Sequence, residues 1–370
     1  MARIVVAMSG GVDSSVTAWL LKQQGHEVIG IFMRTGVESV AHSGPDRKKG
    51  CCSASDAKDA RRIADQLDIP FYAIDFSQEF DSLIELFVDE YVQGRTPNPC
   101  VVCNSRFKFG TLWAQAKQLE ADFLATGHYV RRVDGPFGAE LHMAADANKD
   151  QSYVLFGLKR EVIEGLLFPL GDLTKPEVRE MAAKAGFSVA TKPDSVEICF
   201  VPDHDHARLV RERRPDAGVA GDIVDDAGKV LARHNGIEQF TIGQRKGLNF
   251  AAGSPRYVLK VVPETRQVLV GTRDQLQSSG LVASSMNWQV EPIEGRFACE
   301  ARIRHRHTPA ACFATSFGDG RIEVEFETSQ SAVTPGQALV LYQGTKMLGG
   351  AWIDQAIPAF PRTPVGSKPT

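Results

Sequence analysis

A glycine-rich stretch near the amino terminus, residues 7–14, carries residue types that bind phosphate. It lies between an apolar run, residues 4–6, and an amphipathic run, residues 16–22, which predict a strand and a helix. Paired glycines allow the sharp turn between them, and backbone N–H groups at the start of the helix attract an anion. We therefore predict a nucleotide phosphate site here. Its candidate residues are Ala7, Met8, Ser9, Gly10, Gly11, Val12, Asp13 and Ser14.

Asp13 is unusual in a phosphate loop because a carboxylate repels phosphate. Its presence is explained if it holds a Mg²⁺ ion that neutralises a pyrophosphate. A kinase-type loop would carry Gly-Lys-Ser or Gly-Lys-Thr, and residues 7–15 contain no lysine. The loop instead resembles the Ser-Gly-Gly-x-Asp-Ser loop of ATP pyrophosphatases, which cleave ATP between the α and β phosphates and adenylate a substrate oxygen. The alternative, an ordinary glycine turn with a helix cap, does not explain why all these features coincide.

Cysteines supply a second chemical signal. Cys100 and Cys103 form a Cys-x-x-Cys pair after two prolines, and Cys103 is expected near a helix start with Arg106 and Lys108 close by. Both features lower the pKa of a thiol and increase its thiolate fraction. Cys199 lies where helix-rich sequence gives way to β-rich sequence. A mobile loop at such a seam can bring a thiol into a reaction site.

Other uses of the cysteines stay open. Cys51, Cys52 and the Cys-x-x-Cys pair could hold a zinc ion, although adjacent cysteines are poorly spaced as ligands of one tetrahedral ion. The Cys-x-x-Cys pair could instead be a thioredoxin-like dithiol, which would leave the phosphate loop unexplained. Cys299 and Cys312 lie in apolar, strand-like sequence and are expected to be inert core residues.

The composition is that of a soluble globular protein. Its 370 residues exceed one typical core, so we expect two or three domains. We expect no membrane partner, since no apolar run reaches the length of a membrane span, and no secretory signal, since residues 1–3 lead directly into a strand. Seven cysteines without signs of secretion indicate reduced thiols and a cytoplasmic location. The net charge of −3 means that a nucleic-acid partner would need local basic patches.

The elements that would position these residues alternate between strands and helices up to about residue 205. Strands are predicted over residues 27–33, 71–74 and 121–126, and helices over 56–67 and 80–91. This alternation predicts a parallel sheet with helices on both faces. Ligands of such sheets bind beyond the carboxyl ends of the strands, where Met33 and the Gly127-His128 pair are expected. Met33 could line an adenine pocket or be an ordinary core residue.

After about residue 205, short strand-like runs and glycine-rich turns replace the helices. We predict an α/β domain over residues 1–205, a small β-rich domain over 206–282 and a β-barrel-like domain over 283–360. Residues 361–370 contain three prolines and are expected to be a disordered tail.

Taken together, these motifs resemble those of the bacterial tRNA-specific 2-thiouridylase family, which installs sulfur at C2 of the wobble uridine of some tRNAs. The matching stretches keep their order over nearly the whole chain. They are residues 8–15, 51–52 with 56–57, 98–104, 125–129, 149–153, 197–200, 234–237 and 241–248. The resemblance implies a parallel sheet of the ATP-pyrophosphatase type, followed by two small β-rich domains, with ATP and Mg²⁺ as cofactors and tRNA as partner.

The resemblance also implies roles for single residues. It makes Cys103 the nucleophile and Cys199 the carrier of a persulfide, and it places ATP on residues 7–14, Met33 and Gly127. The target base meets Asn98, Pro99 and Cys100. Further tRNA contacts fall on His128, Lys149, Asp150, Gln151, Arg304, His305 and Gln337. Some relatives carry Asp at the position of Cys100, where it has been suggested as an acid/base group. Here either the thiol does that work or no side chain is needed there.

The implied reaction gives each group a task. Adenylation of the uridine C2 oxygen creates a leaving group, and a persulfide on Cys199 supplies sulfur received from a sulfur-relay protein or a cysteine desulfurase. Either the terminal sulfur attacks C2 and Cys103 resolves the linkage as a disulfide, or Cys103 first liberates sulfide; the sequence leaves both routes open. Both need the two thiols within disulfide reach in one state of the enzyme and the target base flipped into the site.

Local basic clusters are the candidates for tRNA binding. Arg302, Arg304 and Arg306 are predicted to alternate along one strand and share a face, with His305 and His307 extending the stripe. Further candidates are Arg106, Lys108, Arg131, Arg132, Arg208, Arg211, Arg213 and Arg214. A solvated charged surface is the alternative, above all for residues 208–214. Two other functions stay open: another ATP-pyrophosphatase-loop ligase with a different substrate, and non-catalytic RNA binding by the β-rich half.

Overall fold

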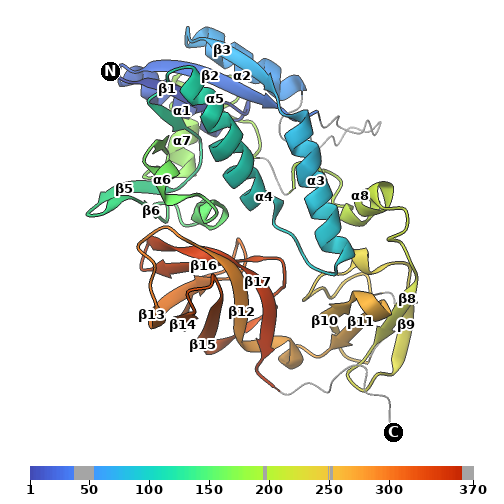
Figure 1. Ribbon diagram of the computed structural model, residues 1–370. Coiled ribbons are helices and arrows are strands. Elements are labelled where there is room, and N and C mark those ends of the chain that lie inside the picture. The colour runs from blue at the N-terminus through green and yellow to red at the C-terminus, as the bar shows by residue number, and fades with distance from the viewer. Residues whose placement is uncertain (37–53, 195–197, 249, 251–252, 361–370) are drawn as a thin grey trace.

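The computed structural model describes residues 1–36, 54–194, 198–248, 250 and 253–360. Within these ranges a parallel sheet, a four-stranded sheet and a closed barrel follow one another along the chain (Figure 1). The predicted fold class, an α/β domain of this type followed by two β-rich parts, is confirmed. Cys51, Cys52 and the tail at 361–370 lie outside the described residues, as do residues 195–197.

The first sheet has the order β3-β2-β1-β4-β7 in the described chain, and all its neighbouring strands are parallel. Its strands are β1 (Arg3–Ala7), β2 (Glu27–Arg34), β3 (Phe71–Asp75), β4 (Phe123–Ala125) and β7 (Leu166–Leu167). The chain runs outward from β1 to β3 and then crosses back to β4 on the other side of β1. The carboxyl ends of β1 and β4 therefore form a switch point, where such sheets bind ligands.

Helices cover both faces of this sheet because alternate strand residues point to opposite sides. Val5 packs in a core with residues of α3 and of the helix that begins at Pro99, whereas Ile4 and Val6 pack with residues of α1, α2 and α7. The helices of this domain are α1 (Val12–Gln23), α2 (Ala54–Gln66), α3 (Ser77–Val92), α4 (Pro99–Val102), α5 (Leu112–Gln118), α6 (Arg160–Ile163) and α7 (Lys175–Lys184).

The helix that carries the Cys-x-x-Cys pair includes both cysteines, with Cys103 near its start as predicted. It begins as α4 at Pro99, continues through a π-helical stretch (Cys103–Thr111) and ends as α5. Proline favours the first helical turn because its missing N–H has no partner to lose there. Cys100 therefore lies in the first turn and Cys103 one turn further on.

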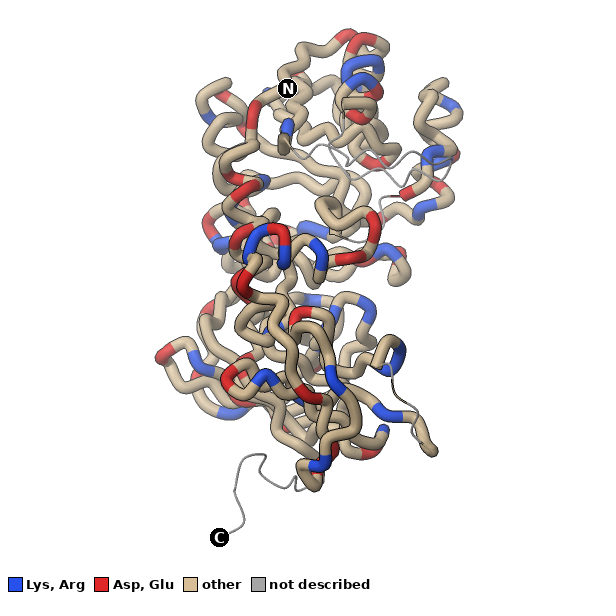
Figure 2. The backbone as a smooth tube through the Cα atoms, turned by 90° about the vertical axis from the view of Figure 1, so that its right-hand side faces the viewer, with Lys and Arg blue, Asp and Glu red and all other residues tan. Residues whose placement is uncertain are grey.

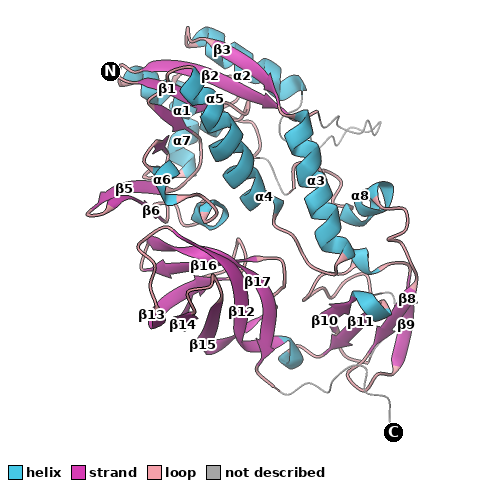
Figure 3. Cartoon of the chain, in the orientation of Figure 1, coloured by secondary structure: helices cyan, strands magenta, loops and turns pink. Residues whose placement is uncertain are grey.

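The middle β-rich part forms a sheet with the order β10-β11-β8-β9 in the described residues. Its strands are β8 (Gly221–Val224), β9 (Val230–His234), β10 (Tyr257–Val262) and β11 (Gln267–Gly271), and they follow helix α8 (His206–Arg213). Ile223, Val258 and Val268 are fully or almost fully buried in its core. This sheet lies beside the far end of α3 (Figure 3).

The last part closes into a barrel, because β12 pairs with both β15 and β17 in the order β12-β15-β14-β13-β16-β17. These strands are β12 (Gln277–Trp288), β13 (Gly295–Arg302), β14 (Ala310–Ser316), β15 (Ile322–Ser331), β16 (Ala338–Gln343) and β17 (Lys346–Pro358). A hairpin from the first domain, β5 (Arg131–Gly135) and β6 (Gly138–His142), extends this sheet at β17. Strand β12 runs through the predicted boundary at 282/283, and the domain limits stay predictions.

Charged residues of both signs are interspersed along the chain in the view of Figure 2. A basic surface must therefore come from particular side chains rather than from the overall charge. None of the helices in the described ranges combines the length and the apolar character needed to span a bilayer.

Candidate nucleotide and thiol sites

The loop between β1 and α1 has the geometry of an anion site. Gly10 has φ +70°, and a Cβ there would lie 2.2 Å from the carbonyl oxygen of Asp56, so only glycine fits. Gly11 is the N-cap of α1 and no side chain caps this helix. Backbone N–H groups of the first turn can therefore face a phosphate, at the positive end of the helix dipole.

Serine side chains hold the loop in shape. The Ser9 N–H donates to Ser14 Oγ (3.1 Å), and the Ser15 hydroxyl donates to the Gly11 carbonyl (2.8 Å). Gly127, which follows β4, lies against the start of α1, since a Cβ there would be 2.8 Å from the Ser14 backbone nitrogen. The two strand ends predicted to form one site are therefore adjacent. Met33 is a buried core residue of the α3 side of the sheet.

Two residues that the sequence did not indicate complete the loop. Lys175 Nζ lies 2.7 and 2.8 Å from the two carboxylate oxygens of Asp13, and the Tyr129 hydroxyl donates to Asp13 Oδ1 (2.8 Å). Burial, with Asp13 as a nearby charge, raises the pKa of Tyr129, so its hydroxyl remains a donor. Both residues are more than 100 positions from Asp13 in the chain, so no local pattern could have revealed them.

Magnesium fits this arrangement poorly. A Mg²⁺ ion in such a site takes one or two carboxylates together with substrate phosphates. Asp13 is the loop's carboxylate, and Lys175 already contacts both of its oxygens. The described residues contain no group of three or more His, Cys, Asp or Glu side chains that could hold a metal.

Asp194 is the centre of a second set of ion pairs. Its carboxylate lies 2.7 Å from Lys149 Nζ, 2.8 Å from Lys175 Nζ and 2.9 Å from an Arg179 guanidinium nitrogen. Burial by itself would raise the pKa of Asp194, but hydrogen bonds from Lys149 and Lys175 lower it to about 2. This carboxylate is therefore ionised at neutral pH and attracts several cations.

Cys103 and Cys199 lie on the same side of the sheet. Both pack, partly buried, against the core that includes α3 and the helix beginning at Pro99. Phe200, next to Cys199, stacks edge-on against Phe87 of α3, with ring centroids 5.1 Å apart. Cys100 is exposed. The five described cysteines occur as thiols rather than in a disulfide, and the proposed zinc set includes Cys51 and Cys52, which are not described.

The segment before the Cys-x-x-Cys pair is held by the barrel. The Gln337 side chain donates to the backbone carbonyls of Thr96 (2.9 Å) and Pro97 (3.1 Å). The Thr96 N–H in turn donates to the Pro335 carbonyl (2.9 Å). Gln337 therefore fixes the backbone that leads to Asn98 and Pro99, the residues predicted to meet the target base.

Other predicted tRNA contacts lie inside the protein. His128 is buried and bonds through Nδ1 to the Thr126 hydroxyl (2.7 Å). Burial, with nearby Lys108, lowers the pKa of His128 well below its usual value, so its ring is neutral. Gln151 accepts a hydrogen bond from the Tyr129 N–H (3.0 Å) through its side chain. Asp150 is buried and ion-paired with Arg302.

The prediction that Arg302, Arg304 and Arg306 alternate along one strand and share a face is wrong. Strand β13 ends at Arg302, whose buried guanidinium pairs with Asp150 and donates to the carbonyls of His305 (2.6 Å) and His307 (3.0 Å). Arg304 and Arg306 lie in the loop after the strand and are exposed. The bonds from Arg302 hold the loop that follows the strand.

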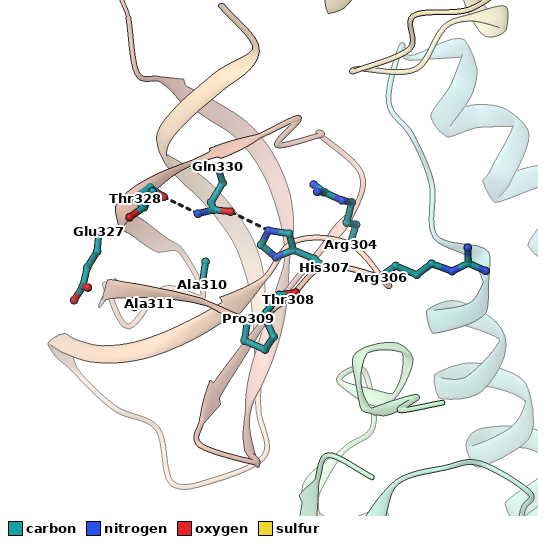
Figure 4. Close-up of a pocket in the computed structure, with 10 residues that line it drawn as sticks. All are labelled: Arg304, Arg306, His307, Thr308, Pro309, Ala310, Ala311, Glu327, Thr328 and Gln330. Carbon is teal, nitrogen blue, oxygen red and sulfur yellow. Dashed lines mark hydrogen bonds between the residues drawn. The ribbon is translucent and has the colours of Figure 1, made fainter. Parts of the chain in front are cut away.

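This loop borders an open pocket of about 480 Å³ on the barrel (Figure 4). Arg304, Arg306, His307, Thr308 and Gln330 are among its lining residues. In the close-up, Arg306 extends away from the barrel toward the helices of the first domain. His307 is buried and bonds through Nε2 to Gln330 Oε1 (3.0 Å). Arg306 is thus presented on the side of the barrel that faces the first domain, whereas the exposed Arg304 donates to the Ser331 carbonyl (3.0 Å).

Three family models match successive stretches of this chain. They are described as the tRNA methyl transferase HUP domain (residues 2–203), the tRNA methyl transferase PRC-barrel domain (208–272) and the aminomethyltransferase beta-barrel domain (278–353). The fold and the site thus define a HUP-domain protein with two appended β-barrel modules.

Curated relatives narrow this class. The chain is 50% identical to the tRNA-specific 2-thiouridylase MnmA of Geobacter metallireducens over 359 residues, which cover 96% of this chain and 97% of the relative. It is 49% identical to the enzyme of the same name from Geotalea uraniireducens, covering 96% of each chain. The chain belongs to the tRNA-specific 2-thiouridylase family, and the resemblance deduced from its motifs is confirmed.

Similarity to solved structures is more limited. A 4-thiouridine synthetase–RNA complex with bound ATP aligns at 17% identity over 58% of this chain and 51% of that chain, with a TM-score of 0.36. The NMN synthetase from Francisella tularensis aligns at 15% identity over 58% of this chain and 77% of that chain, with a TM-score of 0.34.

Proposed function

We propose that this protein is an ATP-dependent tRNA-uridine 2-sulfurtransferase that thiolates the wobble uridine of tRNA. The observation that carries the proposal is the combination of an anion-binding loop at Gly10 and Gly11 with Cys103 and Cys199 on one side of the same sheet. The near-full-length identity to tRNA-specific 2-thiouridylases supports tRNA as the substrate. An ATP-dependent ligase with another substrate would have no use for this thiol pair.

In the first step, the uridine C2 oxygen attacks the α phosphate of ATP and pyrophosphate leaves. The start of α1 binds the leaving phosphates through backbone N–H groups, and Lys175 lies beside them as a cation. Met33 and Gly127 are proposed to border the nucleotide, and Asn98, Pro99 and Cys100 the base. Mg²⁺ at Asp13 stays a prediction from the sequence. To bind there, the ion would have to displace Lys175 from the carboxylate.

In the second step, a persulfide on Cys199 supplies sulfur to C2 and AMP leaves. Cys103 either resolves the linkage as a Cys103–Cys199 disulfide or first liberates sulfide. A sulfur-relay protein or a cysteine desulfurase loads Cys199, and the reaction takes place in the cytoplasm. The target base must leave the tRNA stack to reach this site. Arg304 and His305 are proposed to contact tRNA directly, with Lys149 nearby.

The reaction class can be tested by mass spectrometry of tRNA incubated with the protein, ATP and a persulfide donor. We expect a gain in mass that corresponds to replacement of one oxygen by sulfur. Pyrophosphate release without any gain of sulfur would instead favour another ligase of the ATP-pyrophosphatase type. Absence of both, with tRNA binding retained, would favour a non-catalytic RNA-binding protein.

The roles of the thiols can be tested by loading wild type and three serine variants with a persulfide donor and mapping the extra sulfur by peptide mass. We expect Cys199→Ser to lose the persulfide, and Cys103→Ser to keep it without making thiouridine. Cys100→Ser should retain much activity. Extra sulfur on Cys103 or Cys100 in the wild type would contradict these roles.

The role of the loop can be tested with Asp13→Ala. The variant removes one of the two carboxylates that hold Lys175, the other being Asp194. It should lower pyrophosphate release about 100-fold or more, since preorganised charge is lost at the reacting phosphates. Affinity for tRNA, measured separately by filter binding, should change little. An equal loss of both would contradict a role confined to ATP.

A further inference from the structure

Two cysteines of the barrel lie opposite each other on neighbouring strands. Cys299 of β13 pairs with Cys312 of β14, and along this whole pairing one residue of β13 faces one residue of β14. The two sulfur atoms are 3.6 Å apart, and the Cys312 thiol also donates to the Cys299 carbonyl (3.5 Å). Both side chains pack in the core of the barrel. The sequence indicated two separate core residues, and the structure makes them neighbours.

The backbone positions of this pair suit a disulfide. Residues that lie directly opposite each other in an antiparallel pair have Cα atoms about 4.5 or 5.5 Å apart. Disulfides span Cα separations of about 4.4 to 6.8 Å. The bond can therefore form through rotation of the two side chains, without a change in the register of the strands.

The two thiols differ in their access to solvent. Cys312 is 2% exposed, whereas Cys299 is only partly buried. The hydrogen bond with Cys299, together with burial, raises the pKa of Cys312, so this thiol keeps its proton. An oxidant from solution therefore meets Cys299 first. Because both side chains pack in the barrel core, the oxidant must be small, and a peroxide has the required size.

We propose that Cys299 and Cys312 form a reversible disulfide when the protein meets a peroxide. The Cys299 thiolate attacks one peroxide oxygen and the O–O bond breaks, which gives a sulfenic acid and a hydroxide that takes up the proton lost by the thiol. The Cys312 sulfur then attacks the sulfenic sulfur, and its proton leaves with the sulfenic hydroxyl as water. Two thiols are thus oxidised to one disulfide, and one peroxide is reduced to two waters.

The disulfide closes the hairpin that carries the exposed arginines of the barrel. Residues 303–309 join β13 to β14 and include Arg304 and Arg306. In the reduced protein this loop is held through Arg302, which donates to the carbonyls of His305 and His307. A covalent bond at the base of the hairpin restricts the unfolded chain, so the oxidised barrel should resist unfolding better than the reduced one.

The sequence around the two cysteines allows a direct test. Trypsin cuts after arginine and releases residues 297–302 and 307–321 as separate peptides, each with one cysteine. The full-length reduced protein is treated with hydrogen peroxide at low protein concentration, its remaining thiols are blocked with iodoacetamide, and it is digested. We expect the two peptides to be joined in protein from the monomer band of a non-reducing gel, and to separate in dithiothreitol.

Cys299→Ser keeps every other thiol of the chain and is the matched control, so it should give no joined peptides. Urea unfolding is followed by tryptophan fluorescence, to which Trp288 and Trp352 of the barrel strands contribute. We expect peroxide to raise the urea midpoint of the wild type by about 1 M, and to leave that of Cys299→Ser unchanged. If Cys299→Ser does not fold, Cys312→Ala serves as the control with the same expected results.

Three results would overturn the inference: a sulfinic acid on Cys299 without joined peptides, joined peptides in a dimer band alone, or an equal rise of the midpoint in wild type and variant. A disulfide that forms without raising the midpoint would contradict its effect on the hairpin. The proposed function is tested separately, because this pair packs in a different core from Cys103 and Cys199. Loss or retention of thiouridine formation therefore leaves this inference as it stands.

Discussion

Two arginine-rich segments of this protein have opposite surroundings. On α8 and at its C-cap, Arg214, each of the four arginines is ion-paired within the protein: Arg208 with Asp203, Arg211 with Glu238, Arg213 with Asp81 and Arg214 with Asp89. In the loop after β13, Arg304 and Arg306 are exposed beside an open pocket. The same residue type thus serves packing in one segment and is available to a polyanion in the other.

The difference comes from what lies opposite each segment. Helix α3 presents Asp81, Glu85 and Asp89 at intervals of four residues, which places all three on one helical face. Arg213 at the end of α8 and the next residue, Arg214, form ion pairs with this face. The positive charges of this segment are therefore neutralised by carboxylates of the same protein. An arginine-rich sequence alone does not indicate an RNA-binding surface.

Arg302 belongs to the same stretch as Arg304 and Arg306 but is ion-paired inside the protein, like the arginines of α8. Removing its partner should have the largest effect on stability. Asp150→Ala leaves its guanidinium buried without a carboxylate and should lower the free energy of unfolding by about 3 to 5 kcal/mol. Urea unfolding measures this loss. Asp134→Ala removes the exposed partner of Arg132 and is the control, expected to lose less than about 1 kcal/mol. A loss as small as the control's would mean that the Arg302–Asp150 pair is not essential to the barrel.

Arg211→Ala should also destabilise the protein, though less. Glu238 is almost fully buried, and it would lose its guanidinium partner, while the half-exposed site admits water. We expect a loss of about 2 kcal/mol in the free energy of unfolding. Arg208→Ala, whose partners are exposed, should cost less than about 1 kcal/mol. If Arg211→Ala instead weakened tRNA binding in a folded protein, α8 would belong to the RNA surface.

Arg304→Ala should affect tRNA binding rather than stability. It should leave stability nearly unchanged and reduce the log–log salt dependence of tRNA binding by about one unit, as expected for one lost phosphate contact. Filter binding over a series of salt concentrations measures the slope, with Arg208→Ala as the matched arginine from α8. Equal slopes for the two variants would remove the distinction between the segments.

Acidification should produce the smallest effect and should act on both segments. Burial lowers the pKa of His206 on α8 and of His307 beside Arg304. Each ring is therefore neutral in the folded state, so stability is complete above the unfolded pKa of about 6.5 and falls as pH drops toward the folded value. His307→Gln should lose less stability than wild type between pH 7 and pH 5. Urea unfolding at the two pH values measures both losses, and an equal loss of unfolding free energy in the variant and the wild type would contradict this.

The nucleotide loop could be predicted because its residues are contiguous. The turn at Gly10 and Gly11, the strand before it and the helix after it are all encoded within residues 3–23. Parallel strands that are covered on both faces are almost entirely apolar, so the runs that form β1, β2 and β4 were predictable, and β3 was predicted as well. The two-residue edge strand β7 (Leu166–Leu167) was not predicted. The family could also be identified from the sequence, because the order of the motifs along the chain is itself a property of the sequence.

The surroundings of these motifs were decided by the tertiary structure. Asp13 meets Tyr129 and Lys175 only because α1, β4 and α7 come together at one edge of the sheet. The arginine stripe was wrong because an alternating pattern assumes that the strand continues, and Arg302 instead turns inward to Asp150 from a distant segment. The sequence shows which side chains are charged. Which groups they pair with depends on the tertiary structure, because Coulomb attraction and burial depend on distances in space.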